Sequence, residues 1–121
     1  MTDSDLTQSA SELIQQIKNK DISAVELLDK LLDRIGAVNP DINAVVTLDE
    51  DRARERAAAA DEALENGADW GPLHGLPLTV KDAYEVEGIV TTGGSPKWKD
   101  HVPKRHAEVV QRLTAAGAIV F

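Results

Sequence analysis

The stretch "GPLHGLPLTVKDAYEVEGIVTTGGS", residues 71–95, decides the fold. Its apolar run at residues 76–80 is short and bounded by turn residues, which is typical of a strand buried on both faces. Pro77 places this strand at a start or an edge, because proline lacks the N–H that a central ladder needs. Lys81 and Asp82 follow directly, ahead of a segment rich in threonine and glycine. The pattern predicts a strand that carries one cation and one anion at its carboxyl end.

A helix and a second strand are predicted after this stretch. Residues 107–116, "AEVVQRLTAA", form an amphipathic pattern with Val109, Val110 and Leu113 inward, and Gly117 is the expected stop. The apolar run "AIVF", residues 118–121, begins another strand. Strand, helix and strand predict the start of an α/β architecture. Because a core strand at a chain end leaves an unpaired apolar edge, we expect the N-terminal part of a larger fold.

Two helices are predicted near the N-terminus from their capping boxes. Ser9 is followed by Glu12, and Ser23 is followed by Glu26, each pair ahead of apolar residues at helical spacing. The second helix is expected to end over residues 36–40, "GAVNP", because proline cannot continue the hydrogen-bond ladder.

A strand and a third helix are predicted next. Residues 42–48, "INAVVTL", alternate loosely and are β-branched, which indicates a strand. Residues 49–66 are rich in helix formers with acids in the first turn, and Gly67 stands at the C′ position. We therefore divide the chain into a mainly helical lead-in, residues 1–70, and the start of an α/β core, residues 71–121, within one domain.

The composition narrows the class of protein. The 121 residues contain no cysteine, which excludes a disulfide framework, a thiolate metal site and a cysteine nucleophile. The N-terminus is acidic and no apolar run is long enough to span a bilayer, so a cytoplasmic protein is expected. The net charge of -8 falls on residues 1–66, where 15 acids face 7 bases. Such a surface repels nucleic acid and anionic membranes.

Lys81 has two interpretations from the residues alone. A lysine after an apolar strand is usually a surface residue, and Asp82 next to it is available as its ion-pair partner. Burial would instead disfavour the charged form and make a general base of it, with a hydroxyl in reach. Ser95 is one candidate partner for such a dyad. Residues 91–95, "TTGGS", are either a tight turn or a loop whose N–H groups hold an anion or oxyanion.

The remaining polar features favour structural roles. His74, His101 and His106 are scattered without acids at metal-ligand spacing, so no metal site is predicted. We expect His74 to pack in a turn or bond to backbone, and His106 to cap the helix that follows it. Residues 97–112 carry five bases, two acids and Trp98, a pattern compatible with nucleic-acid binding, but the overall charge favours a solvated loop.

Residues 71–96 closely resemble the N-terminal part of the amidase signature family of hydrolases, through the pattern G-P-L-x-G-x-P-x-x-x-K-D. The resemblance continues through residues 102–120, "VPKRHAEVVQRLTAAGAIV", and backwards over residues 22–64. It implies an α/β fold: N-terminal helices followed by the first strands and helix of that family's mixed sheet, truncated here.

The resemblance also implies a mechanism. In that family the lysine of the "VKD" segment is the base of a Ser–cis-Ser–Lys triad, which makes Lys81 the catalytic residue of this chain. The lysine deprotonates a serine preceded by a cis peptide bond, and that serine relays the proton from the nucleophilic serine that attacks an amide carbonyl. Both serines belong to a downstream Gly/Ser-rich segment, so the 121 residues alone are expected to be inactive. No cofactor is implied.

Three functions are compatible with the resemblance. The first is an amidase acting on carbon–nitrogen bonds other than peptide bonds, with a small-molecule amide substrate, no nucleic-acid or membrane partner, and a homodimer possible through the first helices. The second is the amidotransferase component that supplies ammonia for charged-tRNA correction. That component commonly has asparagine after "KD" and a "TTCAS"-like segment, whereas Ala83 and "TTGGS" favour the general amidases. The third is a truncated, non-catalytic interaction module.

Overall fold

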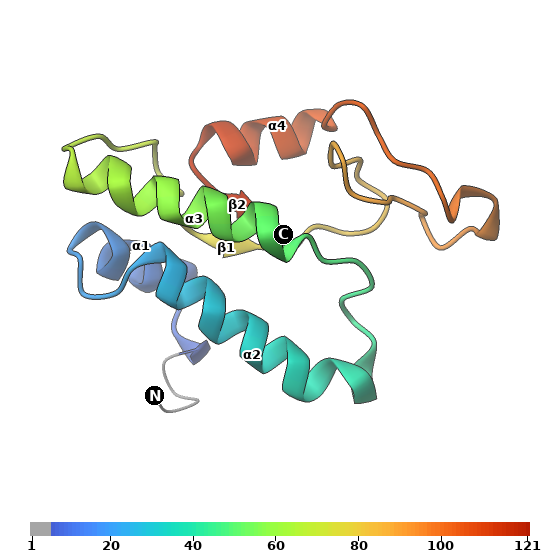
Figure 1. Cartoon of the computed structure of the whole chain (residues 1–121), viewed down its shortest axis with the longest axis horizontal. Helices are drawn as coiled ribbons and strands as arrows, with labels where there is room; N and C mark the ends of the chain where they lie inside the picture. The colour runs from blue at the N-terminus through green and yellow to red at the C-terminus, as the bar shows by residue number, and fades with distance from the viewer. Residues whose placement is uncertain (1–5) are drawn as a thin grey trace.

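The computed structural model describes residues 6–121, where α-helices and short 3-10 segments surround two short strands (Figure 1). In chain order these elements are α1 (Ala10–Lys18), α2 (Ala24–Ile42), α3 (Glu50–Glu65), β1 (Pro77–Leu78), η2 (Pro96–Trp98), α4 (Glu108–Ala115) and β2 (Ile119–Val120).

The predicted strand–helix–strand unit is confirmed. β1 and β2 pair in parallel, with Pro77 opposite Ile119 and Leu78 opposite Val120, and α4 is the connection that parallel strands require. β1 begins at Pro77 as predicted, but it is shorter than the predicted 76–80. The chain leaves the strand at Thr79, which is exposed, so the expectation of a strand buried on both faces over its whole length is wrong.

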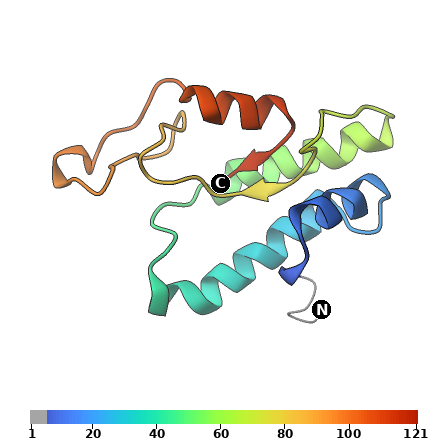
Figure 2. The same ribbon diagram turned by 180° about the vertical axis from the view of Figure 1, so that it is seen from behind.

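The two faces of this small sheet pack against different parts of the chain. Successive strand residues point to opposite faces. Ile119 and Phe121 therefore join the core formed with α2 and α3, while Val120 packs on the other face against Val110 of α4. Figures 1 and 2 show the same layering, with α4 on one side of the strands and α2 on the other. The core is thus α/β in class, as predicted.

Both predicted capping boxes are present and set the starts of α1 and α2. Ser9 and Ser23 each accept a backbone N–H from the glutamate three residues on, and each glutamate bonds back to the serine N–H. The predicted end of the second helix is wrong, because α2 passes Gly36 and Pro40 and ends at Ile42. Pro40 stands in the last turn, where its missing N–H removes only one ladder bond.

The predicted strand at residues 42–48 does not form. Residues 43–49 form neither helix nor strand, and Asn43 is left-handed with φ of 52°. No neighbouring strand among the described residues offers this segment a ladder. The side chain of Asn39 satisfies part of this segment in place of a neighbouring strand. It donates to the carbonyl of Val45 at 2.8 Å and accepts the N–H of the same residue at 2.9 Å. Val46 is left 57% exposed.

The prediction for α3 is confirmed. Asp49 accepts the N–H of Arg52 at the helix start, and Gly67 adopts a left-handed conformation just past the end, with φ of 77°. The buried residues of α3 are Ala53, Ala57 and Ala60, and these small side chains let α3 pack closely against α2.

α4 confirms the predicted helix but corrects two of its details. Val110 is buried as expected, whereas Val109 is 42% exposed rather than inward. His106 does not cap the helix; its Nδ1 accepts the backbone N–H of Glu87 at 3.0 Å, and Ala107 is the N-cap without a side-chain bond. Among residues 6–121 there is no helix with the length and apolar character needed to cross a membrane.

Candidate active site

His74 anchors the segment that leads into β1. It is fully buried, and its Nδ1 accepts the backbone N–H of Trp70 at 2.9 Å. Nε2 lies 2.9 Å from the carbonyl oxygen of Ala60 on α3. Since Nδ1 accepts and a carbonyl can only accept, the proton is assigned to Nε2, which donates to Ala60. The prediction that His74 makes backbone hydrogen bonds in a turn is confirmed.

The same segment crosses the turn between α4 and β2 at very close range. The N–H of Leu73 donates to the carbonyl of Ala116 at 2.8 Å, and the N–H of Gly75 donates to the carbonyl of Gly117 at 3.0 Å. Gly117 has φ of 102°, and a Cβ at that position would lie 2.8 Å from the His74 Cα. Gly117 is thus required both by its conformation and by the contact. These contacts fix where β1 begins and therefore where Lys81 emerges.

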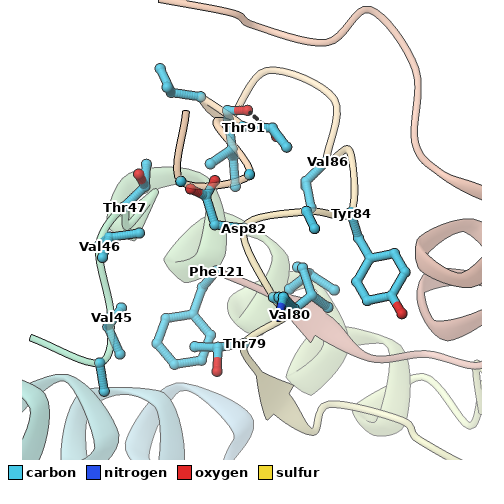
Figure 3. Close-up of a pocket in the computed structure, with 18 residues that line it drawn as sticks. Val45, Val46, Thr47, Thr79, Val80, Asp82, Tyr84, Val86, Thr91 and Phe121 are labelled. Atoms are coloured by element: carbon cyan, nitrogen blue, oxygen red, sulfur yellow. Dashed lines mark hydrogen bonds between the residues drawn. The ribbon is translucent and has the colours of Figure 1, made fainter. Parts of the chain in front are cut away.

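Lys81 lines a cavity of about 430 Å³ beyond the carboxyl ends of both strands. Figure 3 shows the extended segment at Val45–Thr47 on one side of this cavity and the segment after β1 on the other, with the ring of Phe121 between them. The walls are largely apolar, with Val80, Val86, Ile89, Val90, Val120 and Phe121 among the lining residues. A mostly apolar cavity with few polar groups is the usual form of a small-molecule site.

Lys81 itself is exposed, which corresponds to the surface interpretation rather than the buried one within the described residues. The backbone turns at this residue, because the N–H of Tyr84 donates to the Lys81 carbonyl at 2.9 Å. Within residues 6–121, the Lys81 ammonium has neither a hydrogen-bond acceptor nor an ion-pair partner. The Lys81 side chain is therefore an exposed and unpaired part of the cavity lining within the described residues.

Asp82 does not pair with Lys81 but binds the threonine–glycine turn. Its carboxylate accepts the N–H of Thr92 at 2.9 Å and also the Thr92 hydroxyl, and its carbonyl accepts the N–H of Gly93 at 2.6 Å. The hydroxyl bond from Thr92 is the main cause that holds the pKa of Asp82 below its ordinary value, with backbone N–H bonds adding to it.

The "TTGGS" segment is a tight turn rather than an open anion loop. Gly93 and Gly94 have φ of 57° and 74°, and the Gly94 N–H donates to the Thr92 hydroxyl at 3.0 Å. The N–H groups of residues 92–94 are therefore already used by acceptors within the chain. Ser95 lies outside the set of residues lining the cavity, and its N–H donates to the Thr92 carbonyl, so the structure does not bring it to Lys81 as a dyad.

The other candidate polar groups lie apart from this cavity. His101 pairs with Glu85 at 2.8 Å and stacks edge-on against Trp98. Trp98 is 48% exposed, as predicted for a solvated segment. The loop around residue 100 is the orange segment at the right of Figure 1. Over residues 6–121, no three His, Cys, Asp or Glu side chains gather in a group able to hold a metal ion.

Two features of the site escaped sequence reasoning. The cavity wall formed by residues 44–47 comes from a segment expected to be a strand. The bond between Asp82 and Thr92 joins residues ten positions apart, and the only local signal for it is the hydroxyl-bearing residue that directly precedes a Gly-Gly pair.

Comparisons with known proteins agree with this geometry. The sequence pattern of the Amidase family matches residues 26–121. The chain is 41% identical to the A-type component of the glutamyl-tRNA(Gln) amidotransferase of Carboxydothermus hydrogenoformans over 92% of its length, and 37% identical to an acylamidase of Rhodococcus erythropolis over 92%. The structure of the peptide amidase of Stenotrophomonas maltophilia superposes with a TM-score of 0.88 at 31% identity over 95% of the chain. The chain spans 23% of the length of the first two proteins and 24% of the third. It belongs to the amidase family, the amidase signature enzymes.

Proposed function

We propose that these 121 residues supply the general base, Lys81, of an enzyme that hydrolyses a carbon–nitrogen amide bond. The observation that carries the proposal is the position of Lys81 on the wall of an apolar cavity, at the carboxyl end of β1, in a chain of the amidase family. Its ammonium makes no ion pair within the described residues, so the amine is available to another partner.

The proposed chemistry uses two serines that would come from the remaining three quarters of such an enzyme. Neutral Lys81 would take a proton from a serine preceded by a cis peptide bond, and that serine would take the proton of the nucleophilic serine. Attack on the amide carbonyl forms an acyl-enzyme and releases ammonia or an amine, and water then releases the acid. The approach of the rest of the fold would cover the exposed amine and favour its neutral form.

The test is hydrolysis by the complete reading frame that contains these residues. Lys81→Ala and Lys81→Met should each lower kcat by about 10³-fold or more, within the range for loss of a general base. The matched control is Lys99→Ala, an exposed lysine of the loop away from the cavity, which should leave kcat unchanged. Full activity in both Lys81 variants would contradict the assignment. The 121-residue chain alone should release no product.

A second candidate is the ammonia-supplying component of an amidotransferase, favoured by the 41% identity to the glutamyl-tRNA(Gln) amidotransferase chain. The two functions differ in what they need. A self-contained amidase hydrolyses simple acyl amides alone, whereas the amidotransferase component would use glutamine and pass ammonia to a partner bound to charged tRNA. Co-purification with a partner protein, together with glutamine-dependent amidation of tRNA, would establish the second function in place of the first.

A further inference from the structure

We infer that Asp82 is a positioning residue for Lys81: it ties the lysine-bearing segment to the threonine–glycine turn and so fixes one wall of the cavity. The inference rests on the proposed function, because it assigns a role in the same reaction. Asp82 would not touch the reacting atoms.

The first support is the density of bonds between the two segments. Three hydrogen bonds join Asp82 to Thr92 and Gly93, two to its carboxylate and one to its carbonyl. A fourth, from the Gly94 N–H to the Thr92 hydroxyl, closes the turn on itself. The Thr92 hydroxyl is thus a donor to Asp82 and an acceptor from Gly94 at once. Removing either side chain breaks this series of bonds.

The second support is the lack of any other restraint on the lysine. The Lys81 side chain makes no hydrogen bond to the described residues, so its direction depends on its backbone. That backbone is held on one side by the bond from the Tyr84 N–H and on the other by Asp82. A misplacement of about 1 Å in a catalytic group is enough to lower a rate about 10²-fold.

The third support is that the tied elements share the same cavity. Lys81, Asp82, Gly93 and Gly94 all line it. The Asp82 carboxylate binds Thr92 rather than the adjacent ammonium, which leaves the amine unpaired for a serine hydroxyl. The turn would therefore set both the position of the base and the shape of the wall beside it.

The experiment compares variants of the complete reading frame, assayed with a simple primary amide. Asp82→Ala and Thr92→Val should each lower kcat about 10- to 100-fold with KM changed less, because position rather than binding is lost. Thr92→Ser keeps the hydroxyl and should restore kcat to within about threefold of the parent. The control is Asp100→Asn, which changes an exposed acid after η2 and should leave kcat and KM unchanged. The Asp82→Ala/Thr92→Val double variant should be no worse than either single variant, because both break one unit.

A second readout is independent of catalysis. Asp82→Ala removes both carboxylate oxygens and should speed hydrogen exchange at the Thr92 and Gly94 amides by at least about tenfold, while the amides of α4 stay unchanged. If Asp82→Ala and Thr92→Val keep the parental kcat while Lys81→Ala is inactive, the inference is wrong and the proposed function stands. If Lys81→Ala is active, the proposed function is wrong whatever Asp82 does. Unchanged exchange in Asp82→Ala overturns the inference even where no amide is hydrolysed.

Discussion

The carboxylate of Asp61, on α3, caps the first turn of α2 by accepting the N–H of Ala24 at 2.7 Å and that of Val25 at 3.1 Å. The first N–H groups of a helix have no partner inside it. Ser23 satisfies the N–H of Glu26 in the usual way, and Asp61 satisfies two more from a neighbouring helix. A negative charge at this end also favours the helix dipole. These two bonds therefore join the last turns of α3 to the first turn of α2, across 37 residues of sequence in the case of Ala24.

We predict that Asp61→Ala destabilises the protein by about 1–2 kcal/mol, because two partly buried N–H groups lose their acceptor. Asp61→Asn retains one oxygen and should lose about half of that. The free energy of unfolding from urea titration measures both effects. Glu62→Gln, at the next position on α3, is the control and should stay within about 0.5 kcal/mol of the parent.

Combining Asp61→Ala with Ser23→Ala sharpens this test. The two side chains serve neighbouring N–H groups of one turn, so we expect their effects to couple, and the double-variant loss should differ from the sum of the single losses by about 0.5 kcal/mol or more. An unchanged unfolding midpoint in Asp61→Ala would show that water replaces the carboxylate without loss.

The helix starts were predictable because they depend on neighbouring residues. The capping boxes at Ser9 and Ser23 and the acidic start at Asp49 act within one turn, so sequence reasoning found all three. Strands depend on partners elsewhere. Residues 42–48 have the right composition for a strand but face no second strand in the described part of the chain, and Asn39 satisfies Val45 instead. The end of α2 at Ile42 was not predictable in this way, because Pro40 in the last turn removes only one bond and does not stop the helix.

In the site, too, features set by neighbouring residues were predictable and features set by contacts distant in sequence were not. The segment before Lys81 predicts the position of the strand but ends it two residues late, at residue 80 instead of Leu78. The cavity lies beyond the carboxyl ends of the paired strands β1 and β2. The exposure of Lys81 could not be inferred from its neighbours in sequence, because it depends on what covers the residue in space. The ordinary alternative for Asp82, an ion pair with Lys81, does not form, and the carboxylate instead accepts the N–H and the hydroxyl of Thr92.

Two glycines give opposite predictions for the same substitution. Gly117→Ala should destabilise the protein by about 2 kcal/mol or more, since a Cβ there would lie 2.8 Å from the His74 Cα in a left-handed backbone. Gly36→Ala should stabilise it by about 0.5–1 kcal/mol, because Gly36 lies inside α2 with nothing within 4 Å of the added methyl. Thermal unfolding of the two variants measures both effects: the Tm should fall for Gly117→Ala and rise for Gly36→Ala. Equal shifts in one direction would contradict the close contact at Gly117.

The Asp82–Thr92 contact should respond to acid. The Thr92 hydroxyl and backbone N–H groups favour the charged carboxylate and lower the pKa of Asp82. A group whose pKa is lower in the folded state than in the unfolded state stabilises the fold above its unfolded value, and this contribution disappears as the pH falls through the folded value. The turn at residues 92–94 should therefore stay closed from neutral pH to below the ordinary pKa of aspartate, and open only at lower pH.

Chemical shifts of the Thr92 and Gly94 amides, followed on titration with acid, measure this opening. Asp82→Asn carries no titrating group at this position, so the acid-induced change at Thr92 should vanish in that variant while changes elsewhere persist. Glu26→Gln is the matched control, because Glu26 also has a pKa lowered by hydrogen bonds, from Ser23, but lies at the start of α2. It should remove the acid response of the Ser23 amide and leave that of Thr92 intact. A Thr92 response that survives in Asp82→Asn would assign the transition to another carboxylate.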